Sequence, residues 1–479
     1  MLAEPEEYLE RVKGYKREIY VAGKKFYNVF ESRNLKPTVE AIASTYRLAK
    51  NNGGNLHSDL IGEKVNILNS VIKNFEELVA RCEFQRKLSL KLATCNYRCT
   101  GCDAINSLYL ATKSIDTDLG TDYHRRFLSL LKEIQKRDLA CTAALTDPKG
   151  DRSKRMIEQK DMFVRVVEKR SDGIIVNGAK VHQSGAFAAD VNFFLPTAGF
   201  FILPSQSFTK EEKAFAISFA VLPEDKGVKY VLQNTGVQAK QRENGAFEAG
   251  NPFGDRTTCT IILDNVFIPW DRVFIFENIE SIKRALNAFV VVHRCAGLAC
   301  RAGFIDSMIG AASLMMKASG LEEVPALQQK LAEMVALSEA LYGISVGATL
   351  KGSNESGIWL PNQVITTSGK ILGAEFFSKA ILNLIEISGG IIGTAPSEFD
   401  LKGEVGELLQ RYFKASDKFS TEERLRIVKF IEFWVMSSHL VGSVHGGGSP
   451  GSALALLRSS LNLEEREVAV KSILKILYI

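Results

Sequence analysis

The stretch Val291–Cys300, VVHRCAGLAC, constrains the chain most, because it sets a histidine and a cysteine seven residues apart in an apolar, alanine-rich segment. Seven residues make about two helical turns, so His293 and Cys300 are expected on one helix face, about 10 Å apart along the axis. Far upstream, Cys95 and Cys99 are four residues apart, which also fits one helical face. Three thiols and an imidazole form a ligand set suited to zinc or to an iron–sulfur centre.

Spacing alone does not fix which cysteines bind. Cys102 lies seven residues after Cys95, so it is permitted as a substitute ligand. Cys295 is a weaker candidate because, at about 200° from His293, it points to the opposite helix face. The alternative interpretation of Cys95 and Cys99 is structural, since free cysteine is among the most deeply buried residue types.

Composition narrows the class of protein. With 479 residues and 46% apolar content, the chain can bury a large core and form two or three packed units. Its 60 basic and 55 acidic residues are scattered, which argues against nucleic-acid binding, although the small basic excess suits an anionic ligand such as a nucleotide or a CoA ester. No membrane contact is expected, because no apolar run reaches about 18 residues. Without a signal-peptide pattern, the eight cysteines indicate thiols or metal ligands of a cytoplasmic enzyme.

Three parts follow one another along the sequence. Residues 1–140 show helical spacing, residues 141–275 show strand-like runs, and residues 276–479 show long helical segments that would form a bundle. Asp172-Gly173 predicts a hairpin and Asn177-Gly178 a second turn. Further strands are expected at 192–195, 199–203, 214–222 and 257–263, and helices near 279–319, 323–351, 362–392 and 420–440. The last of these helices should begin at the capping box formed by Ser420 and Glu423.

Four polar or glycine-rich segments have both a structural and a functional interpretation. Thr146–Arg152 is a surface turn, or a loop whose amides and cations receive an anionic cofactor. His182–Gly185 is a turn, or a group of donors that faces a heterocycle. Gly389-Gly390 is a helix cap and Ser443–Pro450 a hinge, or both are places where bare backbone approaches a ligand.

Taken together, these motifs resemble a known family. CNYRC, LTDPKGDR, VHQSG, HRCAGLAC, SGGIIGTAPSE and HGGGSP are similar to motifs of the 4-hydroxybutyryl-CoA dehydratases (vinylacetyl-CoA Δ-isomerases), within the wider group of 4-hydroxyphenylacetate 3-hydroxylases. The resemblance implies an α+β, acyl-CoA-dehydrogenase-like fold with a helical N-terminal domain, a central β-domain and a C-terminal helical bundle. It also implies an acyl-CoA substrate, FAD, a 4Fe–4S cluster and a homotetramer.

The resemblance further assigns roles to individual residues. Cys95, Cys99, His293 and Cys300 would ligate the cluster, which leaves Cys102 and Cys295 outside the set. His293 would also act as the catalytic base that removes the α-proton. The segments that would bind FAD contain Thr146, Asp147, Lys149, Gly150, Asp151, Arg152, His182, Gln183, Ser184 and Gly185, with Gly389 and Gly390 also near the flavin.

Two positions depart from the family pattern. Gly297 stands where the family has a tyrosine, and Gly442 where it has a glutamate; both side chains handle protons or assist departure of the hydroxyl group in the family. Loss of a general acid costs about 10²–10⁴-fold in rate, which predicts a slow dehydratase, an isomerase only, or an enzyme for another acyl-CoA. Two alternatives remain: an iron-free aromatic hydroxylase that uses reduced FAD and oxygen, and a non-catalytic paralogue that keeps the fold and the cluster.

Overall fold

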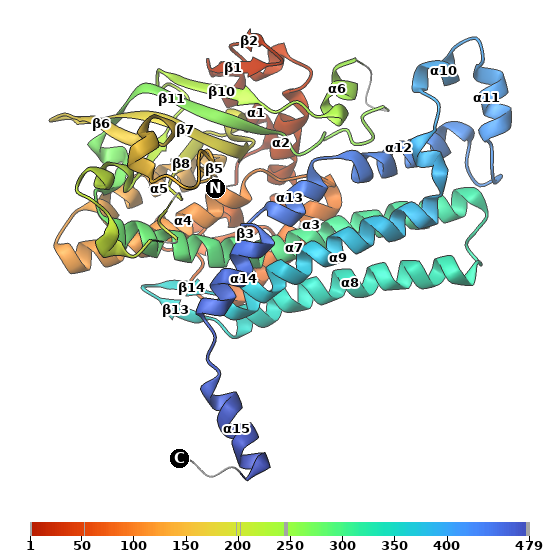
Figure 1. The fold of residues 1–479 in the computed structure, drawn as a ribbon. Coiled ribbons are helices and arrows are strands. Elements are labelled where there is room, and N and C mark those ends of the chain that lie inside the picture. Colours follow the sequence, from red (N-terminus) through yellow and green to blue (C-terminus); the bar gives the residue numbers. More distant parts are fainter. Residues whose placement is uncertain (1, 52, 198, 202, 244–247, 476–479) are drawn as a thin grey trace.

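The helix α7 (Ile279–Ser319) is the long central helix against which five other helices pack (Figure 1). The computed structural model describes residues 2–475 except 52, 198, 202 and 244–247. α7 begins at Asn278, whose side chain accepts a hydrogen bond from the Ser281 amide, and ends at Gly320 in the left-handed conformation. The helix expected near 279–319 is therefore confirmed. Its helical neighbours are α3 (Phe75–Leu92), α4 (Cys99–Leu119), α8 (Pro325–Leu350), α9 (Gln363–Ser388) and α12 (Thr421–Met436).

The remaining helices lie around this bundle and beside the sheets. α12 begins at the predicted capping box, in which Ser420 and Glu423 bond reciprocally. The helix expected over 420–440 ends earlier, because Ser437 adopts an extended conformation that separates α12 from the next helix. The other helices are α1 (Pro5–Gly14), α2 (Lys36–Asn51), α5 (Tyr123–Arg137), α6 (Gly236–Glu243), α10 (Glu398–Lys402), α11 (Gly406–Phe413), α13 (His439–His445), α14 (Pro450–Ser459) and α15 (Glu464–Leu474).

Two larger sheets pack face to face around one apolar core, to which Val176, Ile261, Phe194 and Phe219 contribute. In the described part of the chain, the first sheet has the order β2 (Lys24–Phe26), β1 (Glu18–Val21), β10 (Val228–Leu232), β11 (Thr258–Pro269), β7 (Gly173–Ser184) and β6 (Arg165–Lys169). The second has the order β12 (Val273–Phe276), β9 (Ile217–Val221), β8 (Val191–Phe194) and β5 (Cys141–Ala144). Two small hairpins, β3 (Asn55–Ser58) with β4 (Glu63–Asn66) and β13 (Ser353–Glu355) with β14 (Ile358–Leu360), lie among the helices.

The N-terminal part contains strands where only helices were expected. β1 and β2 extend the first sheet, with β1 parallel to β10 and Ile19 opposite Tyr230. Alternate residues of β1 are buried, so a short β-branched and aromatic run gains more from the sheet than from a helix. The six-stranded sheet thus takes two strands from upstream of residue 141.

The turn expected at Asn177-Gly178 is wrong, whereas the Asp172-Gly173 hairpin between β6 and β7 is confirmed. β7 continues through Gly178 to Ser184 and pairs with β11. Gly178 has a φ of +127°, and a Cβ there would overlap the backbone of Phe163, so close approach of backbone explains this glycine. The strands expected at 192–195, 214–222 and 257–263 correspond to β8, β9 and β11. The described residues of 199–203 form a turn, and residue 202 lies outside the described residues.

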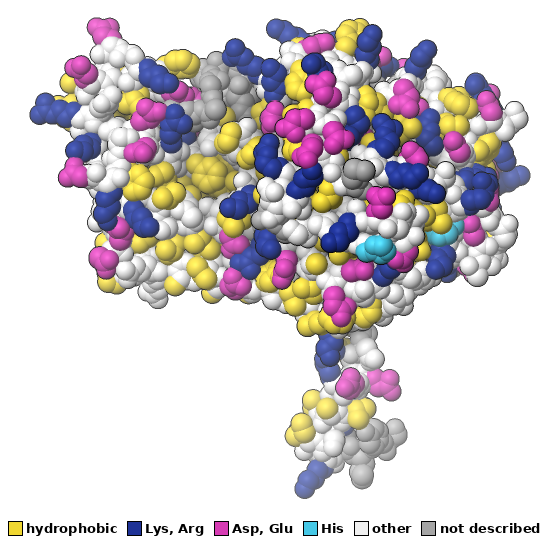
Figure 2. All heavy atoms as spheres, turned by 180° about the vertical axis from the view of Figure 1, so that it is seen from behind, with side chains coloured by type: hydrophobic (Ala, Val, Ile, Leu, Met, Phe, Trp, Pro, Cys, Tyr) yellow, Lys and Arg dark blue, Asp and Glu magenta, His cyan; other side chains and the backbone are white. Residues whose placement is uncertain are grey.

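Among the residues that the structure describes, three helical stretches are by length and composition apolar enough to span a membrane, which was not expected from the sequence: α7, α8 and Thr421–Ser459. In α7, 78% of the apolar window is buried within the fold, which explains its composition without a membrane. In α8 only 28% is buried, so this helix presents an apolar outer face. α15 extends away from the body and carries exposed apolar side chains (Figures 1 and 2).

Candidate active site

Three thiols gather where the start of α4 meets α7. Cys95, Cys99 and Cys300 are all half-buried free cysteines. A hydrogen bond with Cys99 lowers the pKa of Cys95 to about 7 and raises that of Cys99. Burial raises the pKa of Cys300 to about 11, and the nearby charge of Cys95 contributes to the rise. The structure therefore brings together the three cysteines that were predicted as ligands.

Cys95 is positioned by a loop and not by the helix that was predicted. Cys95 is not helical, because Ala93 and Tyr97 on either side of it adopt left-handed conformations. The Asn96 side chain accepts hydrogen bonds from the amides of Arg98 (2.9 Å) and Cys99 (3.0 Å), which fixes the start of α4. The expected helical face shared by Cys95 and Cys99 is thus wrong, and a capped loop places both thiols side by side instead.

His293 is held from behind by a buried carboxylate. Its Nδ1 lies 2.7 Å from Oδ2 of Asp103, and the other oxygen of Asp103 pairs with Arg81. Burial alone would raise the pKa of Asp103, but Arg81 and the hydrogen bond from His293 hold it below its usual value. The ring of His293 also stacks on Phe289 at 5.5 Å between centroids. These contacts fix the orientation of the imidazole and leave Nε2 for a metal or a proton.

Asp103 and Arg81 were not identified from the sequence. The available signal was an acidic residue four positions after Cys99 in an otherwise apolar helix, which places it on the same helix face. Arg81 comes from α3 and carries no motif. Its pairing with Asp103 depends on how α3 and α4 pack together, and that packing is not encoded locally.

The two other candidate cysteines, Cys102 and Cys295, point away from these three thiols. The thiol of Cys102 is buried and donates to the carbonyl of Ile67 at 3.6 Å. Cys295 points to the opposite side of α7, as expected from its angle, where its Sγ lies 3.8 Å from that of Cys82. Within the described ranges, no three His, Cys, Asp or Glu side chains are close enough to bind a single metal ion.

The loop Thr146–Arg152 is anchored from the inside. Asp147 is buried and accepts from Nζ of the buried Lys180 (2.6 Å) and from the amide of Thr197 (2.7 Å). The carbonyl of Thr146 accepts from the amide of Val181 at 2.8 Å. Asp147 thus supports the loop rather than facing a ligand, and its successors Lys149, Gly150, Asp151 and Arg152 are exposed.

The segment His182–Gly185 lies beside this loop and against the cysteine loop. Gln183 is buried, with its side-chain amide 3.4 Å from the carbonyl of Thr146. Ser184 is half-buried in the same strand. Gly185 has a φ of +66°, and a Cβ there would lie 2.7 Å from the Tyr97 ring. Partial burial lowers the pKa of the exposed His182, and the charges of Lys149, Arg256 and His445 lower it further, so these cations surround it.

Gly389 and Gly390 are not brought to these segments within one chain. They end α9 beside α10, which lies at the opposite side of the molecule from the sheets (Figure 1). Both are exposed, and Gly389 has a φ of +70° with open space around it.

Three buried cations hold the end of α13 and the glycines that follow it. Arg294 donates to the Gly447 carbonyl (3.1 Å), Arg301 to the Ser443 carbonyl (2.8 Å), and Lys370 to the Val444 carbonyl (2.6 Å). Burial lowers the pKa of Arg301 to about 10 and that of Lys370 to about 7. A Cβ on Gly447 would lie 3.6 Å from Cδ2 of His293, so this segment borders the imidazole.

The two glycines at 297 and 442 each have a guanidinium next to them. A Cβ on Gly297 would lie 3.1 Å from the Nη1 of Arg301. A Cβ on Gly442 would overlap the guanidinium of Arg256. Arginine side chains therefore occupy the space in front of both glycines, and no motif in the sequence indicates this.

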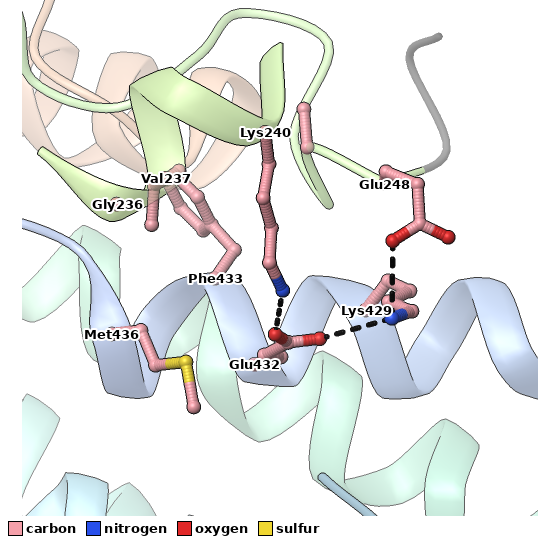
Figure 3. Close-up of a pocket in the computed structure, with 9 residues that line it drawn as sticks. Gly236, Val237, Lys240, Glu248, Lys429, Glu432, Phe433 and Met436 are labelled. Atoms are coloured by element: carbon pink, nitrogen blue, oxygen red, sulfur yellow. Dashed lines mark hydrogen bonds and ion pairs between the residues drawn. The ribbon is translucent and has the colours of Figure 1, made fainter. Parts of the chain in front are cut away.

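A separate small pocket of about 130 Å³ lies between α6 and α12 (Figure 3). Its charged side chains bind each other: Lys429 lies 3.2 Å from Glu248 and 3.4 Å from Glu432, which also pairs with Lys240. These mutual ion pairs give the pocket a structural explanation, and it does not contain the predicted site residues.

Comparisons with known proteins agree with this arrangement. The chain matches the models of the 4-hydroxyphenylacetate 3-hydroxylase N terminal over residues 4–275 and C terminal over residues 283–475. It is 32% identical to the 4-hydroxybutyryl-CoA dehydratase/vinylacetyl-CoA-Δ-isomerase of Clostridium aminobutyricum, over 99% of both chains. The structure of an oxygen-tolerant archaeal 4-hydroxybutyryl-CoA dehydratase from N. maritimus matches with a TM-score of 0.95 and 31% identity, over 100% of this chain and 96% of that one.

A more distant solved structure shares the fold alone. The oxygenase component of 4-hydroxyphenylacetate 3-monooxygenase, complexed with FAD, matches with a TM-score of 0.84 and 21% identity, over 99% of this chain and 98% of that one. With these neighbours, the expected acyl-CoA-dehydrogenase-like α+β fold with a helical C-terminal region is confirmed.

Proposed function

The chain belongs to the 4-hydroxyphenylacetate 3-hydroxylase family, and from this premise we propose that it is a dehydratase and isomerase of acyl-CoA thioesters that uses FAD and a 4Fe–4S cluster. Its reaction would remove water from a 4-hydroxyacyl-CoA, as from 4-hydroxybutyryl-CoA to crotonyl-CoA, and shift the double bond of vinylacetyl-CoA. The observation that carries the proposal is that Cys95, Cys99 and Cys300 lie together, while Asp103, one helical turn after Cys99, orients His293.

The donor set fits a cluster better than a single ion. Three thiols with one imidazole match the ligand types of iron–sulfur centres, in which each ligand binds a different iron and the ligands therefore stand further apart than around one metal ion. Cys95 accepts a hydrogen bond from the Tyr97 amide (3.3 Å), and Cys300 from the hydroxyl of Ser89 (3.2 Å). Such hydrogen bonds stabilise thiolate and tune the potential of a bound cluster.

His293 would have two tasks in this site. Because Asp103 accepts the Nδ1 proton, Nε2 carries the lone pair that either ligates iron or takes the α-proton of the thioester. Imidazole is a weaker ligand than thiolate in this family, so His293 is the ligand that can make way for substrate. When bound, the flavin would accept the hydrogen of the unactivated β-carbon, and the cluster would act as a Lewis acid on the leaving hydroxyl.

The flavin would lie along the two adjoining segments of the β-domain. Lys149, Arg152 and His182 present cationic or polar groups on the exposed side, while Asp147 and Lys180 hold the loop from within. Gly389 and Gly390 lie at the far side of the chain, so they would approach the flavin of a neighbouring subunit.

A homotetramer would account for the surfaces that a single chain leaves exposed. α8 exposes apolar residues such as Val335 and Leu350, and α15 exposes Val470 and Ile473. Apolar faces of this kind are typical of subunit contacts. A molar mass in solution equal to one chain would contradict this proposal.

The test is an anaerobic purification followed by iron, flavin and turnover measurements. We expect about four irons per chain and a visible absorption that bleaches in air, together with FAD. Crotonyl-CoA should form from 4-hydroxybutyryl-CoA or vinylacetyl-CoA. The Cys99→Ser variant should lose iron, whereas Cys102→Ser, matched in chemistry but facing away, should keep it.

Two results would overturn parts of the proposal. Iron-free protein with only a flavin spectrum would remove the cluster and favour a flavin-dependent aromatic hydroxylase. Intact cluster and flavin without turnover of either thioester would favour a non-catalytic paralogue or another substrate. The double variant Gly297→Tyr with Gly442→Glu would then show whether these two glycines are the cause.

A further inference from the structure

Arg256 is a cation beside the glycine-rich segment, and its side chain has no acceptor among the residues that the structure describes. Its Nε is buried with no hydrogen bond, and no ion pair or side-chain hydrogen bond joins its guanidinium to any described residue. The guanidinium fills the space in front of Gly442 and lies 3.9 Å from the Cβ position of Gly446. An arginine that is half-buried in this way normally binds a carboxylate or a phosphate, because its planar fork of donors matches their paired oxygens.

The surroundings of Arg256 are mostly positive, and the acidic group that it influences is the thiol of Cys95, whose pKa its charge helps to lower. Arg301 is close enough for Arg256 to lower its pKa, and Arg294 and Lys370 lie along the same segment. Over residues 2–475 with their gaps, none of these four cations lies within 4.0 Å of a carboxylate oxygen, and three of them donate only to carbonyls and a hydroxyl. Arg294, Arg301 and Lys370 thus bind carbonyls and one hydroxyl, whereas no described residue accepts a hydrogen bond from the side chain of Arg256.

The neighbouring acidic residue does not neutralise Arg256. The carboxylate of Asp255 accepts from the amide (3.1 Å) and the hydroxyl (2.9 Å) of Ser438 and from the hydroxyl of Thr235 (3.1 Å). It is therefore occupied at the start of α13.

The backbone around Arg256 is rigidly placed. Its carbonyl accepts from Gln233 (3.0 Å) and from the hydroxyl of Ser438 (3.1 Å). The Tyr97 hydroxyl donates to the Asp255 carbonyl (3.0 Å) and accepts from the Thr257 amide (3.2 Å). Because Tyr97 belongs to the cysteine loop, the position of Arg256 is fixed relative to the thiols. The backbone of Arg256 is thus already fixed, and only its side chain has to be ordered when it binds an anion.

We propose that Arg256 binds a carboxylate on the acyl chain of the substrate, so that the preferred thioester is the monothioester of a dicarboxylic acid. The inference rests on the proposed function and specifies its substrate class. The glycine-rich segment that Arg256 touches at Gly442 and Gly446 touches His293 at Gly447, so an anion on Arg256 lies near the reacting end of the thioester. An acyl carboxylate belongs at that end. Arg256 also lies near His182 in the segment proposed for FAD, so flavin content is measured alongside thioester binding.

The experiment compares two thioesters of equal carbon number on the anaerobic holoenzyme. Succinyl-CoA carries the carboxylate and butyryl-CoA does not, and their dissociation constants are measured by calorimetry. We expect wild-type protein to bind succinyl-CoA about ten- to a hundredfold more tightly, as for one charge-assisted hydrogen-bonded pair. Arg256→Gln should remove this preference and leave butyryl-CoA binding unchanged. Arg170→Gln, which removes an exposed arginine paired with Glu168, should change neither constant.

A second variant tests the carboxylate site by supplying an anion from the protein itself. Gly442→Glu would introduce a carboxylate beside Arg256, whose flexible guanidinium can move to pair with it. This internal anion should abolish the preference for succinyl-CoA while the protein keeps its flavin. The preference of the wild-type protein is measured without any substitution, so the inference stays testable if a variant does not fold.

The outcomes separate this inference from the proposed function. Equal binding of the two thioesters by wild-type protein, or equal weakening of both by Arg256→Gln, overturns the carboxylate site and leaves an acyl-CoA enzyme. If Arg256→Gln loses flavin but still prefers succinyl-CoA, Arg256 serves the cofactor. This result also overturns the carboxylate site. Failure of wild-type protein to bind either thioester overturns the inference and the proposed function together.

Discussion

The substitution Asp103→Asn should separate the orientation of His293 from the stability of the helices around it. The carboxylate of Asp103 is fully buried and bridges Nδ1 of His293 (2.7 Å) and the guanidinium of Arg81. The amide keeps the shape of the side chain but removes the charge. His293 then loses the acceptor that fixes its tautomer, and Arg81 loses its counter-ion.

The two losses have different magnitudes. Removal of a carboxylate behind a metal-binding histidine typically costs about 10- to 100-fold in metal affinity or activity. Breaking a buried ion pair leaves an uncompensated charge and costs about 3–5 kcal/mol of stability. The upper part of that range applies here, because Arg81 is fully buried and its Nε and Nη1 have no partner among the described residues.

The assay combines iron content with the free energy of unfolding in denaturant. The double variant Arg81→Met with Asp103→Asn removes the stranded cation, so it should regain most of the stability but not the iron. Asp225→Asn is the matched control, because Asp225 pairs with Arg272 at 2.7 Å in the β-domain, away from the thiols. It should lose stability and keep its iron.

Two results would refute this reasoning. Iron affinity of the Asp103→Asn variant within a factor of two of wild type would show that Asp103 does not orient His293. Recovery of iron in the double variant would show that the loss came from unfolding around Arg81 and not from the imidazole.

Two further predictions concern the supports of the site. Burial lowers the pKa of His439 to about 3, so below pH 6.5 the unfolded chain takes up a proton that the folded chain does not, and stability should fall by up to about 1.4 kcal/mol per pH unit. Unfolding midpoints between pH 7 and 5 should fall less steeply in His439→Gln, and parallel curves would contradict this. Gly185→Ala should cost about 1–2 kcal/mol for its left-handed backbone, and more for the contact with Tyr97, with loss of FAD. Gly14→Ala, with open space around it, is the control, and equal unfolding free energies of the two variants would contradict the argument.

The sequence predicted the elements whose signals are local. The helix predicted near 279–319 is α7, and the hairpin predicted at Asp172-Gly173 joins β6 and β7. The turn predicted at Gly178 is wrong because, in sequence, a glycine needed for close backbone approach looks the same as a turn glycine. β1 was missed because a four-residue strand gains its stability from distant β10.

Some residues of the candidate site could be predicted from the sequence, and others could not. His293 and Cys300 follow from helical geometry, and the opposite direction of Cys295 follows from it as well. The cysteine loop depends on the Asn96 cap, which a spacing rule does not contain. Arg256 belongs to no motif, and its importance becomes visible only in the fold, where its buried Nε has no hydrogen-bond acceptor among the described residues.

The spacing of seven residues occurs twice in α7, once for His293 and Cys300 and once for Arg294 and Arg301. The first pair faces the cysteine loop, and the second clamps the glycine-rich segment. The same helix therefore sets the spacing within both pairs. An insertion or deletion of one residue between residues 294 and 300 would rotate Cys300 and Arg301 together by about 100° relative to His293 and Arg294. A change in the length of this helix would therefore displace the proposed cluster ligands and the arginines that hold the glycine-rich segment at the same time. Neither pair can be moved in this way without the other.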